Sequence, residues 1–246
     1  NCTVTNYGFC FLYANKSTPT VVVKNVTVDG GNYGFHWVYG TTATLENVTM
    51  TNVTNGLYIQ NYAGKTISVK GCNITNIAIW EKASANQTFN FEGANTVGTL
   101  SSSQYAKYVL AAEGATLTAP EGSTVTTTVD GYKVAYGDGK YYLKPCDYVA
   151  EIVGGAKYES LQAAIEAAVT GQTVVLLQDI ALTEADLVTV NDASHRVLVK
   201  VDGKDITLNM QGYKIIVNHE NEYTDNANLI VAVICVEEGA GLTVTG

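Results

Sequence analysis

The stretch V-K-N-V-T-V at residues 23–28 recurs as L-E-N-V-T-M at residues 45–50 and as V-K-G-C-N-I at residues 69–74. The copies begin 22 and 24 residues apart, and residues 1–6 (N-C-T-V-T-N) match residues 47–52 (N-V-T-M-T-N) as part of a further copy. A period of about 20–30 residues built from short β-prone strips is typical of a solenoid, in which each repeat forms one rung of a stack. The repeat therefore predicts an all-β solenoid.

A second strip follows each phrase and predicts which side chains line the core. It reads Y-G-F-C-F-L at residues 7–12, Y-G-F-H-W-V at residues 33–38 and N-G-L-Y-I-Q at residues 55–60. Because side chains alternate along a strand, two inward columns are expected, which are Phe9, Phe35 and Leu57, and Phe11, Trp37 and Ile59. The column between them, which is expected to face outward, contains Cys10, His36 and Tyr58.

Glycine and asparagine residues lie where the rungs are expected to turn. The glycine near the start of each second strip (Gly8, Gly34 and Gly56) is expected at a tight corner with positive φ, which costs little without a Cβ atom. Asparagine tolerates the left-handed backbone, and its side chains can form hydrogen-bonded ladders between rungs. The asparagines expected at corners are Asn6, Asn32, Asn52 and Asn76.

The chain is predicted to consist of two blocks, residues 1–144 and 145–246. The first ends in a hairpin over residues 131–143, in which Gly137-Asp138-Gly139 forms the turn. The second begins with the one convincing helical pattern of the chain, at residues 158–169, which Gly171 is expected to end. Its apolar stripe consists of Leu161, Ala164, Ile165 and Ala168. Such a helix can cover the exposed strand edges and apolar cross-section at the end of a solenoid, so we expect a capping helix.

The apolar runs after this helix are spaced like new rungs, and the last of them, residues 242–246, would continue smoothly into residues 1–5. We therefore expect the chain to be one period of a longer assembly. The assembly is either a tandem-repeat polypeptide or copies stacked head to tail. The residues expected at the two joining ends are Asn1, Cys2, Val4, Leu242 and Val244.

Residues 158–180 have the form Y-x-S-L-Q-x-A-I-x-x-A-x-x-G-x-T-V-x-L-L-x-D-I. This segment resembles the opening of right-handed parallel β-helix domains of the pectin-lyase-like superfamily, in particular those repeated in large bacterial surface proteins. Residues 206–215 and 236–246 are similar to the next rungs of such domains, whereas residues 1–145 are β-helical only in general character. The resemblance implies a right-handed parallel β-helix, an extracellular setting, and adhesion, scaffolding or polysaccharide binding. Fold alone does not assign chemistry.

The charge pattern disfavours two classes of partner. The net charge is -9, and Arg196 is the single arginine, which disfavours nucleic acid as a partner. No apolar run approaches the roughly 20 residues of a membrane-spanning helix, so no membrane insertion is expected in this segment.

Catalytic patterns are also missing from the sequence. A lyase for acidic polysaccharides needs clustered carboxylates for calcium beside a strong base, whereas Arg196 has only Asp192 near it. A glycosidase needs two or three converging carboxylates, whereas Asp29, Asp130, Asp138 and Asp202 lie beside glycines and Asp205 lies two residues after one, as is typical of turns. The histidines His36, His195 and His219 lack metal-ligand spacing. We therefore predict no enzymatic activity, no cofactor and no metal.

Three kinds of surface residue leave alternatives open. Among 16 tyrosines and two tryptophans, the best outward candidates for stacking on sugars are Tyr58, Tyr62 and Trp80; the alternative is aromatic ladders that stiffen the rungs. Cysteines are either small buried hydrophobes or form a bridge such as Cys2–Cys10. Asn-x-Ser/Thr sites are either glycan acceptors or a by-product of the repeated N-V-T phrase. They include Asn15, Asn25, Asn47, Asn52, Asn73 and Asn86, besides Asn1.

Taken together, these patterns predict a structural repeat unit of an extracellular bacterial surface fibre, stalk or adhesin. Its expected partners are copies of itself or adjacent repeats, joined head to tail, with glycans as a second class. The alternative is a carbohydrate-binding or polysaccharide-cleaving β-helix protein.

Overall fold

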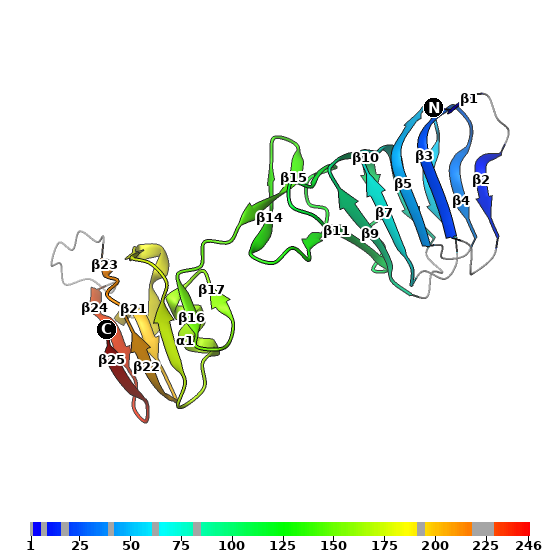
Figure 1. Ribbon diagram of the computed structural model, residues 1–246. Coiled ribbons are helices and arrows are strands. Elements are labelled where there is room, and N and C mark those ends of the chain that lie inside the picture. Colours follow the sequence, from blue (N-terminus) through cyan, green and yellow to red (C-terminus); the bar gives the residue numbers. More distant parts are fainter. Residues whose placement is uncertain are drawn as a thin grey trace. The chain divides into compact units, whose positions relative to one another are not determined.

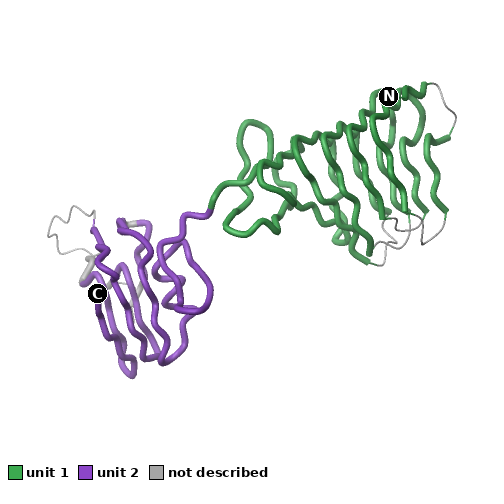
Figure 2. The backbone as a smooth tube through the Cα atoms, viewed as in Figure 1, with its two compact units in different colours: residues 1–145 green, residues 146–246 purple. Residues whose placement is uncertain are grey.

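The computed structural model describes residues 2–5, 9–15, 20–38, 42–60, 64–80, 85–190, 195–217 and 229–246. The chain forms two compact units, Asn1–Pro145 and Cys146–Gly246 (Figure 2). Both are built almost entirely of β-strands (Figure 1). Each unit is described by itself below.

Unit 1 is a β-solenoid whose coils run through three columns of stacked parallel strands. Column A contains the first halves of β3 (Thr20–Asp29) and β5 (Thr42–Thr51), then β7 (Thr66–Lys70), β9 (Gln87–Glu92), β11 (Ala106–Leu110) and β13 (Val125–Thr127). Column B contains β1 (Cys2–Thr5), the second halves of β3 and β5, the start of β8 (Asn73–Ile79), β10 (Ala94–Leu100) and β12 (Thr116–Thr118). Column C contains β2 (Cys10–Ala14), β4 (Tyr33–Trp37), β6 (Asn55–Ile59) and the end of β8. The predicted all-β solenoid is confirmed.

The core of unit 1 consists of inward side chains that stack in register from rung to rung. In column A, for example, Val23, Leu45, Val69 and Phe91 occupy successive paired positions and are almost completely buried. Alternation along each strand sends every second side chain to this interior, and removing such apolar surface from water stabilises the fold by about 25 cal/mol per Å². The strict repeat of apolar positions in the sequence is therefore what fixes the register.

The inward side chains predicted for the strands of column C are confirmed for the second and third copies of the repeat and wrong for the first. Phe35 pairs with Leu57, Trp37 pairs with Ile59, and all four are fully buried. In the first copy, however, Leu12 pairs with Phe35 and Ala14 with Trp37, whereas Phe9 is 57% exposed. The small Ala14 fits beside the bulky Trp37, and this register places the Phe9 ring outside. Phe11 still packs against the core, half-buried beside Phe35.

The role predicted for the glycines of the second strips is also corrected. Neither Gly34 nor Gly56 has a positive φ. A Cβ atom on Gly34 would lie 2.7 Å from the carbonyl oxygen of Gly56, so glycine is needed there because neighbouring rungs approach closely. Gly8 lies outside the described residues.

The left-handed corners lie elsewhere, mainly between columns A and B. Asn25 and Asn47 have φ of 56° and 53°, and the Nδ2 of Asn47 donates to the Oδ1 of Asn25 at 3.1 Å. Among the predicted corner asparagines, Asn52 has a positive φ, while Asn32 and Asn76 instead accept hydrogen bonds from the next or preceding rung. Asn6 lies outside the described part.

A β-hairpin closes one end of unit 1. Strands β14 (Tyr132–Gly137) and β15 (Lys140–Pro145) are joined by Asp138 and Gly139, whose φ of 50° and 74° match the left-handed pair of a tight hairpin turn. Strand β15 pairs antiparallel with β12 and so covers the last strand of column B. Tyr141 is buried here, where its hydroxyl donates to Pro120 O at 3.0 Å and accepts from Ser123 N at 2.7 Å. The predicted terminating hairpin is confirmed.

Unit 2 repeats the three-strand rung. Its first column contains β18 (Thr173–Leu176), β22 (Asp205–Asn209) and β25 (Gly241–Thr245), all parallel. Its second column contains β19 (Ile180–Leu182) and β23 (Ile215–Val217), and its third contains β21 (His195–Val201) and β24 (Leu229–Val236), again parallel. A 3₁₀ turn (Glu184–Asp186) and the short β20 (Val188–Val190), antiparallel to β21, complete it.

A helix and a short hairpin close the first end of unit 2. Helix α1 (Leu161–Ala167) is shorter than predicted, because Tyr158 belongs to β17 (Lys157–Tyr158), which pairs with β16 (Ala150–Ile152), and Ser160 caps the helix. The predicted stripe of Leu161, Ala164, Ile165 and Ala168 is buried, with at most 1% of each residue exposed. Strand β16 pairs antiparallel with β18.

Polar contacts fix this helix to the rungs. The Oε1 of Gln162 accepts from Lys200 N at 2.8 Å, and its Nε2 donates to Lys200 O at 3.2 Å, as a neighbouring strand would do. The ammonium of Lys204 donates to the carbonyl oxygens of Ile165, Glu166 and Ala168, which have no partner within the helix. The helix thus covers a strand edge of the solenoid, as its amphipathic pattern predicted.

Candidate functional site

The first candidate site is the end of unit 1 that the hairpin does not cover. Here β1, β2 and the first half of β3 pair with a neighbour on one side only, as far as the described residues show. Each therefore leaves one row of backbone N–H and C=O groups free for a further strand. One edge comes from each of columns A, B and C.

The second candidate site is the far end of unit 2. Strands β25, β23 and β24 each pair on one side only within the described part of the chain, with β22, β19 and β21 respectively. The three edges again belong to three successive columns of the rung. Unit 1 is thus open at its first rung and unit 2 at its last.

At the open end of unit 2, the inward-facing valines of the last rung are exposed to solvent. Val217, Val236 and Val244 pair with Leu182, Val201 and Leu208, which are buried. The three valines are 37%, 42% and 54% exposed, because no further rung covers them. In the described part of the chain, the apolar cross-section of the solenoid is therefore partly exposed at this end.

At the open end of unit 1, inward side chains of the first rung are also incompletely buried, although to a smaller extent. Val4 pairs with the fully buried Val28 but is itself only half-buried, and Leu12 is half-buried although its partner Phe35 is fully buried. Of the 11 large hydrophobic residues that are exposed in the described chain, eight lie in the two open rungs. These eight are Phe9, Tyr13, Val22, Ile216, Val217, Val233, Val236 and Val244.

The residues predicted at the joining ends all belong to these edges where the structure describes them. Cys2 is exposed and Val4 half-buried in β1, while Leu242 is half-buried and Val244 exposed in β25. Asn1 lies outside the described residues.

A third feature is an aromatic cluster on the outer face of column C, formed by Phe9, Tyr13, Tyr33, His36 and Tyr58. The imidazole of His36 is at its centre, with the four ring centroids 5.0 to 5.5 Å away. Only 8% of His36 is exposed, whereas Phe9 and Tyr13 are 57% and 52% exposed. Burial of the Tyr58 hydroxyl raises its pKa, and the neighbouring Tyr33 adds to the shift.

The polar atoms of His36 are unevenly satisfied. Its Nε2 lies 3.2 Å from the Oε1 of Gln60, while its Nδ1 is buried and has no hydrogen-bond partner in the described structure. Since an amide oxygen only accepts, Nε2 carries a proton in this contact, and in the neutral imidazole Nδ1 is then an acceptor.

Sequence reasoning found this cluster only in part. It placed Tyr58 and His36 in the outward column, which the side chains confirm, but His36 is buried by its neighbours, and Phe9 was wrongly assigned to the core. The signal that could have found the cluster is the run of aromatic residues in one outward register, Tyr13, His36 and Tyr58. Of the other aromatic candidates, Trp80 is half-buried, and Tyr62 lies outside the described residues.

The outer face of column A has a different character. Here the Nζ of Lys24 lies 2.6 Å from the Oε2 of Glu46 in the next rung. A hydrogen bond from Lys24, together with its charge, lowers the pKa of Glu46 below its ordinary value. By contrast, strands β2, β4 and β6 of column C contain no Asp, Glu, Lys or Arg.

The Asn-x-Ser/Thr sites and the cysteines are placed as follows. Asn15, Asn25, Asn47, Asn52, Asn73 and Asn86 are all exposed. The amides of Asn47 and Asn52 also donate hydrogen bonds to the preceding rung, to Asn25 and Asp29 respectively. All five cysteines are free, and Cys72 is buried as a small hydrophobe would be.

Among the described residues, four carboxylates line one cavity of about 230 Å³ in unit 2: Asp147, Glu159, Asp179 and Asp186. Each accepts a hydrogen bond from a neighbouring group, namely Gln178 Nε2, Asp147 N, Lys214 N and Thr183 N respectively. Three or more His, Cys, Asp or Glu side chains do not come together in the described part of the chain in a way that could hold a metal ion. A cavity of about 420 Å³ in unit 1 is lined mainly by hydroxyl groups, with Glu121 as its one carboxylate. Burial raises the pKa of its Tyr108, whose hydroxyl donates to Ser101 O.

Comparison with known proteins does not add a relative. No protein-family description, no curated protein and no solved structure matches the chain. The helices of the described residues include none that is long and apolar enough to cross a membrane.

Proposed function

We propose that this protein is a structural module of an extracellular bacterial surface fibre, stalk or adhesin. The open end of unit 2 receives the open end of unit 1 from an adjacent repeat or a second copy, so that the solenoid continues head to tail. The observation that carries the proposal is the match between these ends. Each presents three strand edges, one from each column of the same kind of rung.

The core positions favour one register for this contact. In unit 2, Leu242 and Val244 continue the inward column of Ile206 and Leu208. The matching inward positions on the first strand of column A in unit 1 are Val21 and Val23. Pairing Leu242 with Val21 and Val244 with Val23 extends the core without a change of period.

The remaining columns join in the same way. Strand β23 then extends onto β1, and β24 onto β2, so that Val217 and Val236 are covered by Val4 and Ala14. Each new backbone hydrogen bond contributes a modest net stabilisation, about 0.5–1.5 kcal/mol, and the covered valines add apolar burial. Pairing at three edges at once makes the contact specific for another solenoid end.

Substitution of Val244 tests the contact. The V244K variant places a charge in the proposed interface, and its matched control V153K carries the same change at a similarly exposed valine beside the covered end of unit 2. Sedimentation velocity and negative-stain imaging should show concentration-dependent linear association of the unsubstituted protein and of V153K. Association should be lost in V244K.

A two-copy tandem polypeptide tests the covalent form of the proposal. The junction should raise the Tm of the joined units above that in a single copy, and V244K in the first copy should remove the increase. A single copy that stays monomeric, combined with a tandem whose Tm equals that of one copy, would contradict the proposal.

The alternative function, a carbohydrate-cleaving β-helix, is not supported by a specific feature of the described residues. Binding of carbohydrate without cleavage has independent support on column C and is developed below.

A further inference from the structure

The aromatic cluster around His36 has the features of a ligand site rather than of core packing. Its rings lie on the outer face of three parallel strands, β2, β4 and β6, while the inward residues of β4 and β6 form the buried core behind them. Phe9 and Tyr13 keep more than half of their surface in contact with water. Large exposed aromatic rings on a rigid support supply flat apolar area with little ordering cost on binding.

The second observation is the unsatisfied nitrogen inside the cluster. A buried polar atom without a hydrogen bond costs free energy, and such an atom in a folded protein calls for an explanation. The Nδ1 of His36 is such an atom, in a side chain that is 92% buried among the four rings. A ligand hydroxyl group can donate to it when the exposed ring of Phe9 or Tyr13 turns aside.

Charge defines the chemical class of the ligand. The strands that carry the cluster contain no Asp, Glu, Lys or Arg, whereas column A of the same unit carries the Lys24–Glu46 pair. An anionic or cationic ligand would have no counter-charge on these strands to compensate for its loss of hydration. The ligand should therefore be uncharged, with an apolar face for the rings and hydroxyl groups for hydrogen bonding.

We propose that this cluster binds an uncharged pyranose sugar. The C–H face of the sugar lies against the rings of Phe9 and Tyr13, and its hydroxyl groups reach the phenol groups of Tyr33 and Tyr58 and the Nδ1 of His36. Gln60 holds the imidazole through Nε2, so that Nδ1 remains an acceptor. Of these residues, His36 and Gln60 act by hydrogen bonding, and the exposed rings supply the apolar contact.

The site does not depend on head-to-tail stacking. Phe9 and Tyr13 belong to the open first rung of unit 1, but their rings lie on the outer face of column C, whereas the proposed stacking uses strand edges and inward side chains. Binding can be measured in the V244K background, in which stacking is blocked. Failure of either proposal is then visible without the other.

The test is calorimetric titration of V244K with neutral hexasaccharides of β-1,4-linked glucose, mannose and xylose, and with hexagalacturonic acid as the anionic comparator. At least one neutral probe should bind saturably. The double substitution Phe9→Ala and Tyr13→Ala should weaken that binding at least about tenfold, because both stacking rings are removed. Tyr213→Ala, at an exposed tyrosine of unit 2, is the matched control and should leave the affinity unchanged.

Two further measurements keep the test decisive. Fluorescence of Trp37 and Trp80, which both lie in unit 1, checks that the double variant is folded. In the V244K protein with its aromatic cluster intact, the ring proton signals of His36, assigned by comparison with His36→Gln, should shift when the neutral probe is added.

Several outcomes would overturn the inference. These are absence of saturable binding by every neutral probe, equal binding of hexagalacturonic acid, or an unchanged affinity in the folded double variant. A change of oligomeric state in the double variant without sugar would instead identify the cluster as a protein contact, and so would also reject the inference.

Discussion

The two units share one kind of rung but are closed at opposite ends and by different means. In unit 1 the closed end follows the last rung, where the β14–β15 hairpin pairs antiparallel with β12. In unit 2 the closed end precedes the first rung, where α1 and the β16–β17 hairpin cover it. Among the described residues, each unit is therefore closed at one end, and the open end is the first rung in unit 1 and the last rung in unit 2.

This difference shows that a strand edge can be satisfied either by another strand or by a single side chain. The hairpin of unit 1 supplies backbone groups directly, with Tyr141 buried against the last rung. In unit 2 the amide of Gln162 replaces a missing strand at Lys200. A covering hairpin or helix keeps the apolar cross-section of a solenoid away from water. The exposed valines at the open end of unit 2 show the effect of leaving that cross-section uncovered.

The largest effect is expected where the hairpin closure is broken. Tyr141→Ala should lower the free energy of unfolding of unit 1 by about 3–5 kcal/mol, because a buried ring is lost. Tyr141→Phe should cost about 1–3 kcal/mol, because Ser123 N and Pro120 O lose their partner. Urea titration followed by tryptophan fluorescence measures this, since both tryptophans belong to unit 1. Equal stability of the two variants would contradict a role for the ring itself.

A smaller effect is expected at the helix closure. Gln162→Ala leaves the backbone N–H and C=O of Lys200 without their partner, which should cost unit 2 about 1–3 kcal/mol. Gln162→Glu keeps an acceptor for Lys200 N and should lose less. Hydrogen exchange of the Lys200 amide should quicken in Gln162→Ala more than in Gln162→Glu. Identical exchange in both variants would show that the amide does not act as a strand substitute.

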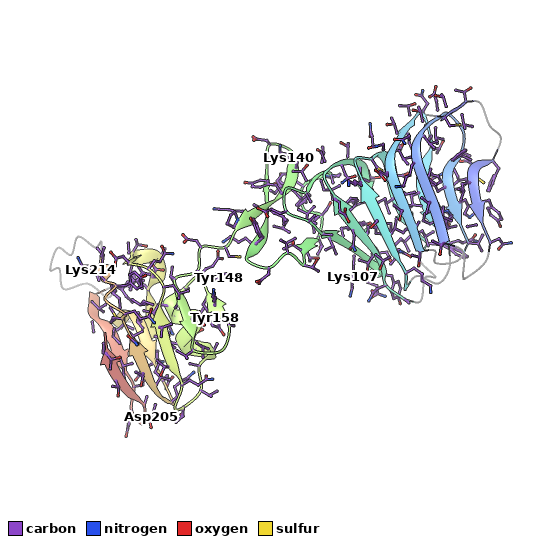
Figure 3. The ribbon with its side chains drawn as sticks, viewed as in Figure 1. Lys107, Lys140, Tyr148, Tyr158, Asp205 and Lys214 are labelled. Carbon is purple, nitrogen blue, oxygen red and sulfur yellow. The ribbon has the colours of Figure 1, made fainter. Side chains whose placement is uncertain are left out.

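The smallest effect is expected at the exposed pair of Lys24 and Glu46, away from either closure. The folded-state pKa of Glu46 lies below its ordinary value, so the pair stabilises the fold above that value, and its contribution is lost as the pH falls through the lowered pKa. Lys24→Met should therefore lower the Tm slightly at pH 7 and leave it unchanged in strong acid. Lys107→Met, on β11 of the same unit and remote from the open end (Figure 3), is the control that should show no such pH dependence. A Tm difference that persists in acid would show that Lys24 acts through packing instead.

The sequence was a good guide wherever the repeat was regular. The apolar positions of the second and third copies predicted the buried pairs Phe35–Leu57 and Trp37–Ile59, because a period of two leaves little choice of face. The stripe on α1 was equally clear, since four apolar residues at helical spacing can only pack on one side. The start of the helix was predicted too early, because Tyr158 belongs to a strand that pairs with β16.

The prediction for the first copy was wrong because its sequence matches the second copy in a different register from the one in which the two strands pair. Residues 7–9 and 33–35 both read Y-G-F, yet Phe35 pairs with Leu12 and not with Phe9. In the observed register the small Ala14 lies beside the bulky Trp37 of the next rung. The same shift brought Phe9 to the outer cluster, which sequence spacing alone could not reveal.

The sequence by itself determined the coil of short strands, the division into rungs and the covering helix, because these follow from periodicity and local apolar pattern. Only the tertiary structure decided which strand edges are left without a partner among the described residues and which rings gather around His36. Both depend on contacts between rungs more than 20 residues apart, and such contacts are set by packing and hydrogen bonding across the stack rather than by the order of neighbouring residues.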